Sequence, residues 1–136
     1  GGIGMSRNYD EIKIHLPQKA DYLGFIRLSV SGLASRMGFD IDAIEDIKVA
    51  VSEVCSRIIS MNQDASANYD ITFQLSESGL KAVFSTENHP GCDIFEGESG
   101  DFAKAIICSL MDEFEITYGQ NIVITMGKKP GDCVNG

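Results

Sequence analysis

The sequence has few basic side chains and lacks the long apolar runs that mark membrane proteins. Its 11 Lys and Arg stand against 20 Asp and Glu, a formal net charge of -9. Nucleic-acid binding depends on a basic face that displaces counterions. No stretch approaches the roughly 20 consecutive apolar residues that cross a bilayer. We therefore expect neither nucleic acid nor a membrane as a partner, which leaves a protein or a small ligand.

The sequence also lacks the cysteine spacings of disulfide scaffolds and zinc sites. Its four cysteines form no CxxC pair, and neither histidine stands at a metal-ligand spacing from one of them. Cys55 and Cys108 lie in apolar stretches, as small buried thiols do. We expect no disulfide framework, no metal site and a reducing, cytoplasmic location. Residues 1–4 ahead of Met5 resemble a cloning leader, and no signal peptide pattern follows Met5.

What the sequence does have is the composition and periodicity of one small α+β domain. The chain has 136 residues, 43% of them hydrophobic, enough for a single core. The apolar spacing predicts the order β-α-α-β-β-α-β-β, with a domain over residues 10–127 and a flexible tail over 128–136. The expected strands are 12–16, 69–75, 80–84, 114–118 and 122–126, and the expected helices are 19–37, 42–58 and 102–110. Segregated helices on one face of a mixed or antiparallel sheet make a two-layer α/β sandwich.

The second expected helix carries the most informative pattern. Asp40 or Asp42 can cap this helix, and Glu53 and Arg57 lie one turn apart on it. By spacing alone they are typical of a surface ion pair. The run IEDIKVAVSEVCSR, residues 44–57, resembles the N-box helix of the bacterial anti-sigma-factor serine kinases, members of the histidine kinase-like ATPase superfamily.

The resemblance covers about residues 10–127. The first helix (GFIRLSVSGLASRMGF) and the run LMDEF at 110–114 are similar to the same kinases. The resemblance implies the two-layer sandwich of that superfamily. It also implies an ATP site formed by the family's three sequence motifs, which are called boxes and of which the N-box is the first. Glu53 matches the general base of the family. Arg57 stands where the family has the asparagine that holds Mg²⁺, and a guanidinium has no lone pair with which to ligate a cation. Arg57 would touch phosphate directly or pair with Glu53 and close the site.

The other two boxes also depart from the family pattern. Thr86 replaces the aspartate that receives the adenine amino group, and strand alternation turns Glu87 to the opposite face. Asn88 follows as a substitute metal ligand if the site is active. Of the glycine-rich phosphate loop only Gly100 remains, and the span from Thr86 to Gly100 is short. We therefore expect that no cofactor binds; ATP and Mg²⁺ are the cofactors if the site still functions.

Three functions are open at this point. The first is an anti-sigma-like regulator that binds a sigma factor or an anti-anti-sigma (STAS-type) protein without kinase activity. The resemblance then implies a homodimer, with Asp21 and Arg27 of the first helix at the partner surface. The second is an active protein serine kinase that uses Glu53 as base. The third is a site for another small ligand, with Arg57 as an anion clamp.

Overall fold

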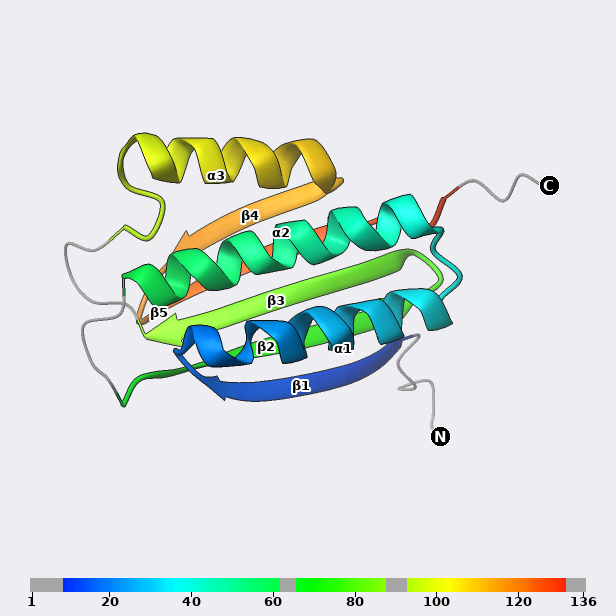
Figure 1. Cartoon of the computed structure of the whole chain (residues 1–136), viewed down its shortest axis with the longest axis horizontal. Coiled ribbons are helices and arrows are strands. Elements are labelled where there is room, and N and C mark those ends of the chain that lie inside the picture. The colour runs from blue at the N-terminus through cyan, green and yellow to red at the C-terminus, as the bar shows by residue number, and fades with distance from the viewer. Residues whose placement is uncertain (1–8, 62–65, 88–92, 132–136) are drawn as a thin grey trace.

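The computed structural model describes residues 9–61, 66–87 and 93–131, which form two layers (Figure 1). One layer is a five-stranded sheet in the order β1-β2-β3-β5-β4, in which all neighbours are antiparallel. Three α-helices cover one of its faces. The predicted α+β class and element order are confirmed. The elements are β1 (Tyr9–Pro17), the 3-10 turn η1 (Ala20–Tyr22), α1 (Leu23–Arg36), α2 (Ile41–Ser60), β2 (Asn68–Ser76), β3 (Gly79–Glu87), α3 (Gly97–Leu110), β4 (Glu113–Tyr118) and β5 (Asn121–Lys128).

The core lies between the sheet and the helices, because alternate strand residues point toward the helical layer. In β3 the buried side chains are Leu80, Ala82, Phe84 and Thr86, and Glu87 is exposed. Burying these side chains against the helices is the main stabilising contribution to such a sandwich. None of the helices within the described ranges has the length and apolar character needed to cross a membrane.

Helix α2 is the central helix, with α1 on one side and α3 on the other (Figure 1). Of the two expected caps, Asp40 is the one that closes its first turn, since its Oδ1 accepts a hydrogen bond from the Ala43 backbone N–H at 2.8 Å. The buried side of α2 is wider than the predicted stripe and includes Ala50, which is fully buried. On the side of α2 that carries Ala50, the charged residues Asp46, Glu53 and Arg57 are half-buried, so this side is only partly open to solvent.

Cys55, also on α2, is fully buried as predicted. Burial raises the pKa of its thiol to about 12. A thiol with so high a pKa stays protonated at neutral pH and is a poor nucleophile. The prediction for Cys108 is wrong, because this residue is exposed on α3. Its neighbour Ile107 takes the buried position, and successive helical residues point about 100° apart.

Several boundaries also differ from the prediction. The expected first helix, 19–37, begins as α1 only at Leu23, so Asp21 lies in η1 ahead of it. Helix α3 begins at Gly97, several residues before the expected start at Phe102, because its first turn is polar and exposed and gives no apolar period. Strand β5 includes Lys128, where the flexible tail was expected to begin. The Lys128 ammonium donates to the Leu110 carbonyl at 2.6 Å, which fixes this end of the strand.

Candidate functional site

Arg57, near the C-terminal end of α2, reaches across to the segment that leads into α3. We call residues 93–96 the lead-in. The Arg57 Nε donates to the Ile94 carbonyl at 2.6 Å and its Nη2 to the Glu96 carbonyl at 3.4 Å. Its Nη1 donates to the Ser99 hydroxyl at 3.2 Å, in the first turn of α3. Three of the five N–H groups of the guanidinium are thus used within the chain.

The ion pair expected between Glu53 and Arg57 is wrong. Within the described residues no hydrogen bond or ion pair joins the two side chains. The physical reason is that backbone carbonyls of the lead-in lie within reach of the guanidinium, and charged donors to carbonyls make strong hydrogen bonds.

The lead-in itself is packed into the fold. Ile94 and Phe95 are 3% and 2% exposed. The Phe95 ring meets Phe114 of β4 edge-on, with centroids 5.9 Å apart, and the Lys104 ammonium lies 5.8 Å from the Phe95 centroid. The sequence showed no period over this stretch, so these two apolar side chains were not predicted to be buried.

Asp93 holds the start of the lead-in. Its Oδ1 accepts hydrogen bonds from the Phe95 backbone N–H at 2.9 Å and from the Tyr118 hydroxyl at 2.8 Å. The hydrogen bond from Phe95 is the main cause that lowers the pKa of the Asp93 carboxyl, and the charges of Lys104 and Arg57 act in the same direction. A carboxylate is therefore the preferred form of Asp93 in the folded chain.

Gly100, on the first turns of α3, is buried against the lead-in. A Cβ built on Gly100 would lie 2.1 Å from the Phe95 carbonyl oxygen and 2.2 Å from the carbonyl carbon. Only a residue without a side chain allows this approach. The resemblance relates Gly100 to a phosphate-binding loop, but in this chain the space beside it is taken by the chain's own backbone.

Thr86 lies at the end of β3 on the helix side of the sheet and is 7% exposed. Its Oγ1 accepts a hydrogen bond from the Gln18 Nε2 at 2.8 Å, and the same nitrogen donates to the Asn68 carbonyl at 3.1 Å. The sequence did not single out Gln18, which directly follows the end of β1 and belongs to no periodic element. Glu87 is exposed on the opposite face of the sheet from Thr86, and Asn88 lies outside the described residues.

Arg27 of α1 joins that helix to α2, on the side of α2 away from α3. Its Nε donates to the Ser52 hydroxyl at 2.9 Å. Arg27 and Glu53 line the same hollow of about 270 Å³ between α1 and α2, together with Glu45, Lys48, Val49 and Ser52. Asp21 is exposed in η1. The structure thus places Glu53 beside Arg27, while Arg57 turns toward α3.

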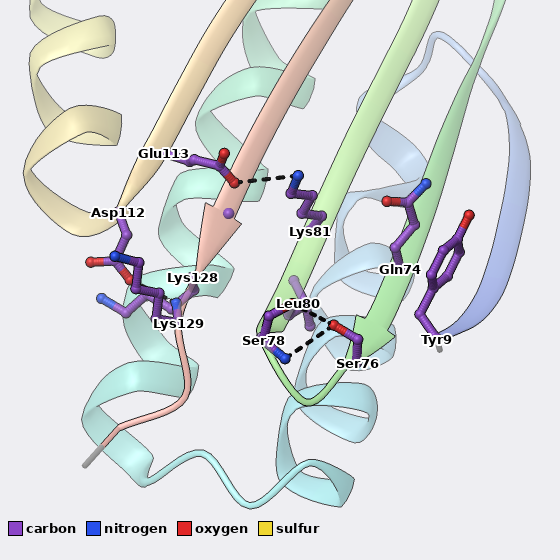
Figure 2. A pocket seen from close by; sticks show the side chains of 12 residues that line it. Tyr9, Gln74, Ser76, Ser78, Leu80, Lys81, Asp112, Glu113, Lys128 and Lys129 are labelled. Carbon is purple, nitrogen blue, oxygen red and sulfur yellow. Dashed lines mark hydrogen bonds and ion pairs between the residues drawn. The ribbon is translucent and has the colours of Figure 1, made fainter. Parts of the chain in front are cut away.

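A second hollow, of about 540 Å³, lies beside the hairpin between β2 and β3, at the end of β3 away from Thr86 (Figure 2). Its polar groups are largely satisfied within the chain. Lys81 and Glu113 form an ion pair at 3.7 Å, and the Lys129 backbone N–H donates to the Asp112 carboxylate at 2.7 Å. This hollow therefore shows no set of convergent, unpaired groups that would define a ligand.

The residues at the family's ATP position do not fit Mg²⁺-ATP as the resemblance would place it. Arg57 offers no lone pair to a cation, and its donors are bonded to the lead-in and Ser99. No phosphoryl-transfer step through Mg²⁺-ATP follows from these residues.

Comparison with known proteins defines the class. The sequence profile of the histidine kinase-like ATPase domain matches residues 16–128. The serine-protein kinase RsbW of Oceanobacillus iheyensis is 31% identical over 138 residues, covering 89% of this chain and 87% of its own length. RsbW of Bacillus subtilis is 29% identical over 141 residues, covering 91% and 88%. The chain therefore belongs to the histidine kinase-like ATPase domain family, in the branch of the RsbW kinases.

A solved structure shows the same fold. The crystal structure of the RsbU and RsbW domains of a Mycobacterium tuberculosis protein matches with a TM-score of 0.70 at 15% identity. The match covers 89% of this chain and 32% of that one, so this chain spans about a third of the solved chain.

Proposed function

We propose that this chain is an anti-sigma-factor-like regulator that binds a sigma factor or a STAS-type anti-anti-sigma protein in the cytoplasm and has lost Mg²⁺-ATP-dependent kinase activity. The binding role is supported by its place among the RsbW kinases. The loss of activity is supported by three altered positions at the ATP boxes. Thr86, one of these positions, is bonded to Gln18, and Gly100, the glycine that remains of the phosphate loop, is packed against Phe95.

One observation carries the proposal. At the position of the family's metal-holding asparagine, Arg57 donates to two carbonyls and a hydroxyl of this same chain. Binding Mg²⁺ there would bring two positive charges beside the guanidinium, and burial weakens the solvent screening that would reduce their repulsion. Phosphoryl transfer depends on metal and phosphate positioning, so this position is decisive for activity.

The surface of β1 and α1 supports a homodimer and a partner contact. Ile12 of β1 and Phe25 and Leu28 of α1 are 38%, 52% and 74% exposed. Exposed large apolar side chains are common at interaction surfaces. Arg27 and Asp21 lie on the same part of the chain. The net charge of -9 would speed the encounter with a basic protein.

Calorimetry with Mg²⁺-ATP tests the loss of nucleotide binding, with RsbW of Bacillus subtilis as the positive control. We expect no heat up to millimolar ATP. Micromolar binding that disappears in Glu53→Ala contradicts the proposal. Gel filtration with each purified sigma factor and STAS protein of the source genome tests the binding role, and a stable complex with at least one of them is expected.

An active serine kinase is the second candidate, because Glu53 keeps the position of the family's base and the relatives are named as serine-protein kinases. This candidate requires transfer of labelled γ-phosphate from ATP to a serine of a STAS protein. That transfer would be lost in Glu53→Gln, which removes the base while preserving the shape of the side chain.

A further inference from the structure

We propose that Arg57 is a positioning residue that holds the lead-in and the first turn of α3 in place without any bound nucleotide. The inference rests on the proposed function and deepens it. It assigns to a side chain of this protein the task of ordering the segment beside the altered ATP position. A partner would then meet the same surface whether or not ATP is present.

The guanidinium of Arg57 contacts both segments at once. Its three nitrogens donate hydrogen bonds to Ile94, Glu96 and Ser99. One planar guanidinium therefore holds both the lead-in and the helix that follows it. Arginine is suited to this because its donors are planar and fixed relative to one another. The two carbonyls belong to backbone that would otherwise need other donors.

The lead-in is also held on the side away from Arg57, by contacts with β4 and α3. Asp93 ties the same segment to Tyr118 of β4 and to the Phe95 N–H. The Phe95 ring is held by Phe114, and its carbonyl lies against Gly100. The lead-in is therefore fixed from α2 on one side and from β4 and α3 on the other. Both sets of contacts come from the chain itself.

These contacts give Arg57 a role that a surface arginine does not have. Removing the guanidinium leaves the carbonyls of Ile94 and Glu96 without these donors, while the contacts of Asp93 and Phe95 remain. The expected result is local opening of the lead-in and the start of α3, with the sheet intact. Lysine retains the charge but has a single nitrogen, so it cannot hold three acceptors in the fixed geometry of the guanidinium.

Hydrogen–deuterium exchange of the full chain tests the proposal. The variants are Arg57→Asn and Arg57→Lys, and Arg36→Asn is the matched control because Arg36 is exposed at the end of α1. In the wild type, amides of residues 93–103 are expected to exchange slowly without nucleotide and to be unchanged by millimolar Mg²⁺-ATP. Arg57→Asn is expected to speed their exchange at least about tenfold, as loss of charged hydrogen bonds implies. Arg36→Asn and the amides of β2 should show no change.

The proposal is overturned if Arg57→Asn leaves exchange over residues 93–103 at the wild-type rate. It is also overturned if these amides exchange rapidly in the wild type and become slow only with Mg²⁺-ATP. If Arg57→Asn does not fold, Arg57→Lys is judged by the same criterion. Failure here is distinct from failure of the proposed function, since calorimetry and phosphate transfer measure nucleotide use regardless of how the lead-in is ordered.

Discussion

Replacing Gly100 by alanine tests whether the close approach of α3 to the lead-in is what requires glycine. The added methyl carbon would lie 2.1 Å from the Phe95 carbonyl oxygen, where ordinary contacts are about 3.5 Å. Backbone must therefore move by up to about 1.4 Å to restore an ordinary contact. Overpacking of this kind costs typically 1–3 kcal/mol, and the upper end applies because the obstructing atoms belong to the main chain. Alanine regains up to about 1 kcal/mol of helix propensity, so the expected net loss is about 2 kcal/mol.

Gly32→Ala is the matched control. Gly32 also lies within a helix and is exposed, but nothing stands within 4 Å of a Cβ built on it. Propensity alone then applies, and this variant should gain up to about 1 kcal/mol. The free energies of unfolding from urea titrations followed by circular dichroism should thus move in opposite directions, about 3 kcal/mol apart.

Both variants are measured at one protein concentration and without nucleotide, since association or ligand would shift the apparent stability. Gly100→Ala as stable as the wild type, or stabilised like Gly32→Ala, would refute the packing argument. A loss of stability without ligand shows that the backbone of Phe95, rather than a phosphate, requires the glycine at this position.

The remaining predictions concern the same region. Phe95→Ala should lower the free energy of unfolding by about 3–5 kcal/mol, whereas Phe102→Ala, at a residue 69% exposed, should change it by less than about 0.5 kcal/mol; equal losses in urea titrations would contradict the burial of Phe95. Thr86→Val removes the acceptor that Gln18 uses and should cost about 1–3 kcal/mol, and an unchanged melting temperature would show that this hydrogen bond contributes nothing. Because the pKa of Asp93 is lowered from 3.8 in the folded chain, its charge stabilises the fold above pH 3.8 and this contribution is lost as pH falls through the folded pKa. The stability difference between wild type and Asp93→Asn should accordingly shrink in acid unfolding curves below pH 3.8, and a difference that grows there would contradict the assigned direction.

The element order could be predicted because residues that face the core are apolar and recur at the period of the helix or strand that carries them. Ile47, Val51, Val54 and Ile58 recur at helical spacing and are all buried in α2. The alternation of Ile71, Phe73 and Leu75 likewise gives the buried side of β2. The first turn of α3 was missed because none of its side chains contacts the core, so no period marks it.

The contacts of the site could not be predicted in the same way. Arg57 bonds to carbonyls of residues 94 and 96, and a backbone carbonyl is the same whichever residue carries it. The residue types of the lead-in therefore do not indicate that its carbonyls accept hydrogen bonds from Arg57. The resemblance located the altered positions Arg57 and Thr86 and the retained Gly100. The groups that bond to Arg57 and Thr86 come from distant segments that only the fold brings together.

The place of β1 at the edge of the sheet has a consequence for the order of folding. Its only strand partner in the described sheet is β2, and the pairs run from Tyr9 with Ser76 to Pro17 with Asn68, so both α1 and α2 lie in the loop that must close. The hairpins of β2 with β3 and of β4 with β5 close over a few residues. Because closure entropy grows with loop length and is compensated only after contacts form, the two hairpins are expected to form early and β1 to join last. The strand at the start of the chain is then the first to detach when the native protein opens locally.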